Sequence, residues 1–135
     1  MKLLIDINIV LDIALGRQPW AGDAALLFAE IVSGRAEGLV AGHTITTFHY
    51  IVAKEKGRQV AATAIVDLLR IVTVVPLETA DFHQALLLGL SDFEDAVQAT
   101  AAMKVGADYV VTRNGRDFKG APVDARTPAE VLALI

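Results

Sequence analysis

With 135 residues, of which 54% are hydrophobic, the chain can bury the core of one compact domain and leaves surplus apolar surface for self-association. Its net charge of −4 is the opposite of what a dedicated nucleic-acid-binding protein usually carries, so contact with a polyanion requires local basic residues or a bridging cation. The chain has no cysteine, which excludes disulfides, thiolate nucleophiles and zinc–sulfur sites.

Short apolar runs and helical patterns alternate along the chain. In order, we predict strand 2–5, helix 7–15, helix 19–34, strand 38–41, helix 44–57, helix 59–69, strand 71–75, helices 79–88 and 92–105, strand 107–112 and a final helix. Each strand candidate is short and continuously apolar, which is typical of strands buried on both faces of a sheet. The alternation therefore predicts an α/β fold with a central, mainly parallel sheet that helices cover on both faces.

Proline, glycine and capping residues mark several of the predicted helix ends. Pro19 is expected in the opening turn of the second helix. The third helix is expected to begin at a Thr44 cap and to end at Gly57. In the final helix, Thr127 and Glu130 have the spacing of a capping box.

The apolar start of the chain is interrupted by Asp6, Asn8 and Asp12, and no cleavage-site pattern follows it, so it does not resemble a signal peptide. No apolar stretch approaches the roughly 20 residues that span a bilayer. We therefore expect a cytoplasmic protein that makes no membrane contact.

Acidic residues follow two of the predicted strands at the point where each strand ends. Asp6 is the first residue after strand 2–5, and Asp117 lies in the polar loop after strand 107–112. In parallel α/β sheets, ligands bind beyond the carboxyl ends of the strands. We therefore expect these two acids, from distant parts of the chain, to lie at one edge of the sheet.

The segment LSDFEDAVQATAAMKVG, residues 90–106, adds three carboxylates at the start of a predicted helix. Ser91 and Glu94 have the spacing of a capping box, so Glu94 is expected to serve the helix start. Asp92 and Asp95 are three residues apart and share a face, and small residues after Asp95 on that face allow the helix to approach the sheet closely. Asp95 is therefore predicted to face the edge of the sheet, near the other two acids.

Three carboxylates at one partly buried place repel one another, and each raises the pKa of the others. A bound Mg²⁺ or Mn²⁺ would remove this conflict, because both cations prefer oxygen ligands. The same cation would let an acidic protein hold and hydrolyse a phosphodiester. Arg113, Arg116 and Lys119 flank Asp117 and are candidates for contacts with neighbouring phosphates.

Each of these residues also has a simpler interpretation when it is taken alone. Asp6 could cap the helix that follows it, Asp92 could be a first-turn acid that favours the helix dipole, and Asp117 could be a solvated loop residue. Asn8 and Asn114 fit either supporting groups of a site or ordinary turn formers.

The histidines and the single tryptophan give weaker indications of a functional site. His43 and His49 are six residues apart on a predicted helix and so lie on different faces, which argues against a two-histidine metal site. Trp20 is expected to pack against the domain or to lie at an interface.

Four segments resemble a known family. LLIDINIVLD is similar to the opening strand and Asp-x-Asn signature of PIN domains. DFEDAVQATAA resembles their helix that presents a central acid, matched here by Asp95, and VVTRNGRDF resembles their Thr-Arg-Asn/Asp…Asp-Phe stretch. The terminal RTPAEVLALI also fits, so the resemblance extends nearly from end to end.

The resemblance implies a single PIN-like domain over residues 1–135, with a three-layer α/β/α fold around a parallel sheet. It implies a ribonuclease that depends on Mg²⁺ or Mn²⁺, commonly the VapC-type toxin of a type II toxin–antitoxin pair. A small antitoxin that covers the acidic pocket is then the expected partner, and a homodimer is the form that the family often adopts.

The family's functional residues can be matched to this chain position by position. The catalytic and metal-binding acids correspond to Asp6, Asp95 and Asp117. The polar positions that support them correspond to Asn8, Thr112 and Asn114.

The chain departs from the family pattern at one position. PIN domains usually carry a glutamate on the helix after the second strand, where this chain has His49. His49 could ligate Mn²⁺ or transfer a proton, or Asp92 could substitute for the missing acid. The departure supports a second hypothesis, a PIN-fold module that binds RNA or protein with weak or no catalytic activity.

A third hypothesis, a phosphatase with Asp6 as nucleophile, ranks lower because the second aspartate of the haloacid-dehalogenase pattern is missing.

Overall fold

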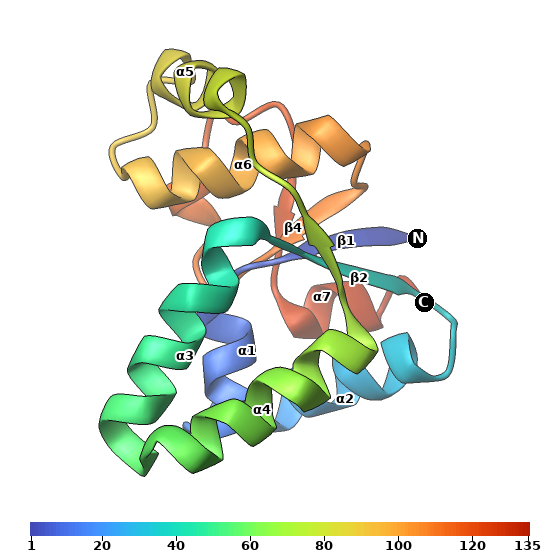
Figure 1. Cartoon of the computed structure of the whole chain (residues 1–135). Coiled ribbons are helices and arrows are strands. Elements are labelled where there is room, and N and C mark those ends of the chain that lie inside the picture. Colours follow the sequence, from blue (N-terminus) through green and yellow to red (C-terminus); the bar gives the residue numbers. More distant parts are fainter.

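Five parallel strands form the central sheet of the computed structural model, which describes residues 1–135 (Figure 1). The strands are β1 (Lys2–Ile5), β2 (Glu37–Ala41), β3 (Thr73–Val75), β4 (Tyr109–Val111) and β5 (Ala125–Arg126). They lie in the order β3-β2-β1-β4-β5, and each pair of neighbours is parallel. β1 is therefore the central strand, and its carboxyl end lies between those of β2 and β4.

Helices cover both faces of this sheet. They are α1 (Ile7–Leu15), α2 (Ala21–Val32), α3 (Gly42–Lys56), α4 (Arg58–Ile71), α5 (Thr79–Leu87), α6 (Phe93–Val105) and α7 (Pro128–Leu132), with a short 3₁₀ helix, η1 (Gly115–Phe118), after β4. α1 to α4 and α7 lie on one face, and α5 and α6 lie on the other (Figure 1). The predicted three-layer α/β/α fold with a parallel central sheet is confirmed.

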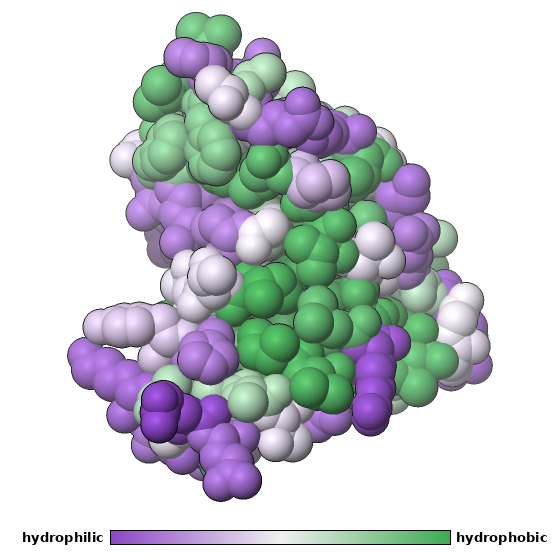
Figure 2. Space-filling model, viewed as in Figure 1, coloured by the Kyte–Doolittle hydropathy of each residue, from purple (hydrophilic) through white to green (hydrophobic).

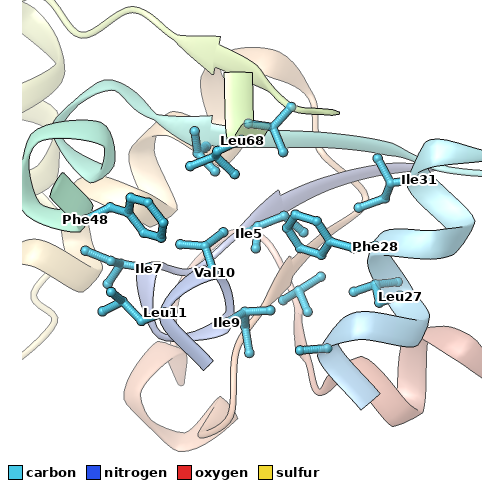
Figure 3. Close-up of a cluster of buried hydrophobic side chains, with 14 of the residues drawn as sticks. Ile5, Ile7, Ile9, Val10, Leu11, Leu27, Phe28, Ile31, Phe48 and Leu68 are labelled. Atoms are coloured by element: carbon cyan, nitrogen blue, oxygen red, sulfur yellow. The ribbon is translucent and has the colours of Figure 1, made fainter. Parts of the chain in front are cut away.

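Two apolar clusters, one on each face of the sheet, form the core. Leu3 and Ile5 of β1 belong to the larger cluster, whereas Leu4 between them belongs to the cluster beneath α6. Successive residues of a strand point to opposite faces, so a strand covered on both sides must be apolar throughout. In Figure 3, side chains from α1, α2, α3 and α4 surround Ile5 on the first face.

α6 packs directly on the second face through small side chains. Ala99, Ala101 and Ala102 are fully buried there, which confirms the prediction that small residues let this helix approach the sheet closely. The close approach brings the first turn of α6 to the carboxyl edge of β1. None of the helices combines the length and the apolar composition that crossing a membrane would need.

Several strand and helix boundaries differ from the predicted ones. α3 begins at Gly42, directly after β2, so Thr44 is buried inside the helix and does not cap it. The connection is short because residue 42 has no side chain: a Cβ there would lie 3.2 Å from the carbonyl oxygen of Val75. α4 continues to Ile71, so β3 is shorter than predicted. β5 was not predicted, because it has only two residues and both are partly exposed.

The cap of α6 also differs from the predicted one. Asp92 is the N-cap residue, and its Oδ1 accepts a hydrogen bond from the backbone N–H of Asp95 at 3.0 Å. The predicted capping box of Ser91 and Glu94 is therefore wrong. Aspartate is as good a cap as serine, and the presence of both beside a Glu made the sequence signal ambiguous. Glu94 therefore has no role in capping α6.

The remaining residues that were predicted to mark helix ends agree with the structure, except Pro19. The capping box of Thr127 and Glu130 is present at the start of α7, and Gly57 follows the last residue of α3. Pro19 lies in the turn before α2, two residues ahead of the first helical residue, and not in its opening turn.

Candidate active site at the carboxyl edge of the sheet

Asp6 follows the last residue of β1 and is the most buried acid at this edge, with 4% of its surface exposed. Its Oδ1 accepts a hydrogen bond from Gln98 Nε2 of α6, and its Oδ2 accepts one from Thr112 Oγ1, each at 2.9 Å. Asp6 stands at the N-cap position of α1, but its side chain makes no capping hydrogen bond. The carboxylate is therefore held by two other elements of the fold.

Burial raises the pKa of Asp6, against the hydrogen bonds from Gln98 and Thr112 that favour its charged form. Gln98 also accepts a hydrogen bond from the backbone N–H of Ile7 through Oε1, at 3.1 Å. One fully buried amide thus connects α6 to the start of α1 and orients Asp6.

Asp95 lies in the first turn of α6, three residues before Gln98 on the same helix face. Its pKa is raised to about 7, first by burial and then by the negative charges of Asp92, Asp6, Asp117 and Glu94, in that order. These acids come from α6, the end of β1 and η1. The three acids predicted to share one edge of the sheet therefore lie close enough for their charges to interact.

Asp117 lies in η1, after β4, and its side chain is exposed, as is that of Asn8 in the first turn of α1. Thr112 Oγ1 donates to Asp6 and also accepts a hydrogen bond from the backbone N–H of Asn114 at 3.3 Å. The loop that carries Asp117 is thereby anchored to the buried acid.

The acids do not form a closed ligand set. No group of three or more His, Asp or Glu side chains stands in an arrangement that could hold a metal ion by itself. Mg²⁺ does not need such a group, because it usually keeps several waters and takes one or two carboxylates. The chemistry of the donors, oxygen atoms of acids that repel one another, suits a hard, partly hydrated cation.

Arg113 differs from the other two basic candidates. Its Nε donates to Asp12 Oδ2 at 2.8 Å, its second guanidinium nitrogen donates to Asp12 Oδ1, and Asp12 is fully buried. The guanidinium also lies 3.9 Å from the centre of the Trp20 ring. Arg116 and Lys119 are exposed, so their charges are available to a ligand at the surface.

His43 is the histidine that lies beside the acids. It follows β2 by two residues, and its Nε2 is 4.0 Å from Glu94 Oε2. Both ring nitrogens are buried without a hydrogen-bond partner. Burial lowers the pKa of His43, and the charges of Glu94 and Asp6 oppose that shift. His49, one and a half turns further along α3, makes no side-chain hydrogen bond or ion pair.

Gln98 and His43 are the site residues that sequence analysis missed. His43 follows the carboxyl end of β2, and the strand-end rule that identified Asp6 and Asp117 would have identified it too. Gln98 is a polar residue in an alanine-rich buried helix, three positions after Asp95, and that spacing was the available signal.

The PIN domain family model matches residues 2–116, which is most of the chain. The chain belongs to the PIN domain family. The match includes Asp6 and Asp95 and ends one residue before Asp117. No curated protein matches the sequence.

Solved structures share this PIN fold over nearly their whole length. VapBC of Salmonella typhimurium, solved bound to DNA, has a TM-score of 0.74 and 16% identity, and the alignment covers 95% of this chain and 98% of that one. VapC20 of Mycobacterium tuberculosis, described as a toxin that cleaves the sarcin-ricin loop, has a TM-score of 0.72, 19% identity and coverages of 90% and 95%. VapBC-1 of nontypeable Haemophilus influenzae has a TM-score of 0.72, 16% identity and coverages of 96% and 99%. At such identities the comparison establishes a common fold.

Proposed function

We propose that this PIN-domain protein is a metal-dependent ribonuclease and the toxin of a type II toxin–antitoxin pair. The observation that carries the proposal is the convergence of Asp6, Asp95 and Asp117, from three separate elements, at the carboxyl edge of the sheet. Their mutual repulsion makes the edge unfavourable in the absence of a cation. A fold shared with a toxin described as cleaving RNA supports the same reaction class.

Asp6, Asp95 and Asp117 would hold Mg²⁺ or Mn²⁺, directly or through water. When bound, such a cation activates a water and stabilises the charge that develops on the phosphodiester. The chain's own residues supply the geometry. Gln98 and Thr112 fix both oxygens of Asp6, so this acid keeps one orientation while the more exposed acids adjust.

The surface around the acids would bind the RNA backbone. Arg116 and Lys119 lie on either side of Asp117, are exposed and make no ion pair with a carboxylate. Local positive charge of this kind compensates for the overall charge of −4, which would otherwise repel a polyanion. Asn8 and Asn114, exposed near the same acids, offer further hydrogen-bonding groups to substrate or cation-bound water.

Two protein partners belong to this proposal. The structural relatives include a toxin–antitoxin complex from Klebsiella pneumoniae, which matches with a TM-score of 0.69 and 19% identity, and this supports an antitoxin as partner. A second copy of the chain is the other partner. Figure 2 shows a continuous hydrophobic area across the middle of the molecule, over β3 and part of α4. Val66 and Leu69 of α4 are each about half exposed.

An RNA cleavage assay in Mn²⁺ tests the enzyme. We expect the wild type to cleave single-stranded or structured RNA, EDTA to abolish cleavage, and Asp6→Asn to reduce the rate by at least about a hundredfold, because the buried acid is lost from the cation site. Glu55→Gln, which removes an exposed acid from the far end of α3, is the control. Equal rates for wild type and Asp6→Asn would contradict the proposal.

A second readout measures the cation without catalysis. A cation that binds only the folded protein raises its melting temperature. We expect Mn²⁺ to raise the melting temperature of the wild type and of Glu55→Gln, and to leave that of Asp95→Asn nearly unchanged.

A binding module without hydrolytic activity is the second candidate, and the absence of a closed three-acid ligand set favours it. In that case RNA would bind in EDTA as well as in Mn²⁺, and no cleavage would be seen with either. The two assays together therefore separate an enzyme, a cation-binding protein without activity, and a module that needs no cation.

A further inference from the structure

A cavity of about 380 Å³ is lined in part by Arg113, which directly follows Thr112, the residue whose hydroxyl donates to Asp6. Its walls come from α1, the turn before α2, the first turn of α2, the loop after β4 and the start of α7. Ile9 lies at its apolar wall, and Pro19 and Pro128 add rigid apolar surface. The proposed cation chemistry uses none of these residues.

Trp20 and Arg113 both line this cavity, and they form a fixed stack. The guanidinium carbon of Arg113 lies 3.9 Å from the centre of the indole ring, and the indole is 43% exposed. Arg113 is held from behind by the fully buried Asp12, which accepts hydrogen bonds from two of its nitrogens. A large aromatic surface is thus kept at the protein surface in one orientation, although burial against the domain would be the ordinary place for it.

The charges around the cavity indicate which part of an RNA chain, phosphate or base, it would bind. Asp12 pairs with Arg113 and lies 4.0 Å from Arg17, and the exposed carboxylate of Asp23 lies at the cavity wall. These two acids balance the two arginines, so the cavity has no excess positive charge to attract a phosphate. A nucleobase suits it better, because bases stack on aromatic rings and on guanidinium planes. Asp23 can accept hydrogen bonds from the exocyclic amino group of cytosine, adenine or guanine, whereas uracil has no such group.

We propose that the cavity formed by Trp20, Arg113 and Asp23 binds one base of the RNA strand whose phosphodiester lies at the acids. This inference rests on the proposed ribonuclease function and adds a substrate subsite to it. Arg113 directly follows Thr112, whose hydroxyl donates to Asp6, so the stack and the buried acid are linked through adjacent residues. A base in the cavity would fix the position of the strand relative to the acids.

The fluorescence of Trp20 provides a direct test, because it is the only tryptophan in the chain. The probes are single-stranded oligocytidylate, oligoadenylate and oligouridylate of six nucleotides. Each is titrated at equilibrium in EDTA and measured in Mn²⁺ by stopped flow before turnover. We expect saturable quenching with all three, and binding of the cytidylate and adenylate at least about threefold tighter than that of the uridylate.

Variants test the same subsite through the affinity of fluorescein-labelled RNA. Trp20→Ala should weaken binding about tenfold, since stacking on an aromatic side chain is worth roughly 1–3 kcal/mol per base, and Trp20→Phe should retain most of the affinity. Asp23→Asn should reduce the preference for cytidylate over uridylate. Tyr50→Ala, which removes an exposed aromatic ring from α3, is the control and should bind as the wild type does. Circular dichroism of each variant verifies that it is folded.

The outcomes distinguish this inference from the proposed function. If the wild type cleaves RNA but Trp20 fluorescence does not respond and Trp20→Ala binds as the wild type does, the subsite is overturned and the ribonuclease stands. If no RNA binds or is cleaved by the wild type in either condition, both proposals fail. Quenching without any base preference, unchanged in Asp23→Asn, overturns the role assigned to Asp23.

Discussion

Asp6 is an unusual residue to find almost fully buried, and two hydrogen bonds explain how the fold retains it. Gln98 and Thr112 each satisfy one of its oxygens, and Gln98 also accepts from the backbone N–H of Ile7. A buried polar group is tolerated when its hydrogen bonds are made and is costly when they are not. The stability of the domain should therefore depend on Gln98, although this residue would touch neither cation nor substrate.

We predict that Gln98→Leu destabilises the protein by about 1–3 kcal/mol, because the substitution leaves Asp6 Oδ1 and the Ile7 N–H buried without partners. Leucine has a similar volume, so the effect of packing is small. Urea unfolding followed by circular dichroism measures the change. Gln59→Leu, at an exposed position of α4, should alter the free energy of unfolding by less than about 0.5 kcal/mol. Equal effects of the two substitutions would show that the buried network does not contribute.

Asp95 gives a prediction about pH, because its pKa of about 7 in the folded protein is higher than the ordinary 3.8. Below pH 3.8 the carboxyl is protonated in both folded and unfolded states and has no effect on stability. As pH rises towards 7 the unfolded state ionises first, so the free energy of unfolding falls, and above 7 the loss is complete.

Asp95→Asn removes this loss. In EDTA we expect the variant to be more stable than the wild type by on the order of 1 kcal/mol at pH 8, a value that allows for solvent screening, with a smaller gain at pH 5. Urea unfolding at the two pH values measures both gains. Glu55→Gln should change stability little and equally at both pH values. A gain for Asp95→Asn that does not grow with pH would contradict repulsion among the acids.

At the scale of the secondary-structure elements, the sequence predicted the site better where an acid follows a strand than where a side chain enters from a helix. Asp6 and Asp117 were located by topology alone, since parallel strands bring their carboxyl ends to one edge. Asp95 was placed by the spacing of residues on α6. Gln98 was missed because its contact with Asp6 depends on how closely α6 approaches β1, and packing sets that distance. His43 follows the end of β2, so the strand-end rule could have identified it.

The differences between the predicted and observed strand and helix boundaries have similar causes. β5 pairs with β4 over two partly exposed residues and has no apolar run to indicate it. α3 begins two residues before the threonine that was expected to cap it, because Gly42 allows the chain to pass close to the end of β3. At the start of α3 a tertiary contact thus overrode a local capping preference, whereas β5 depends on its pairing with β4 alone.

The first turn of α6 should tolerate a change of charge at Asp92 but not the loss of its hydrogen bond. Asp92 accepts the backbone N–H of Asp95 at 3.0 Å as the N-cap. We predict that Asp92→Ala lowers the free energy of unfolding by about 1 kcal/mol, whereas Asp92→Asn, which keeps a capping oxygen, does not. Urea unfolding at pH 5, where repulsion with Asp95 is smaller, measures the cap. Similar losses in both variants would assign the effect to charge.

At the scale of the whole molecule, the hydrophobic area over β3 and α4 bears on the assembly state. β3 is an edge strand, and α4 presents Val66 and Leu69, three residues apart and therefore on one face of the helix. Contiguous exposed apolar surface on a soluble domain commonly marks an interface. A two-fold dimer would bury the same area of both copies, since such interfaces pair one surface with itself.

We predict that the wild type is a dimer in solution, with twice the chain mass of 14.4 kDa by light scattering after size-exclusion chromatography. Leu69→Glu should shift it to the monomer, because dimerisation would bury an unpaired carboxylate in each copy. Leu26→Glu, at a leucine of α2 that is 60% exposed, is the matched control and should remain dimeric. If Leu26→Glu dissociates and Leu69→Glu does not, the interface lies on α2. If the wild type is a monomer, the α4 face does not pair with a second copy of the chain.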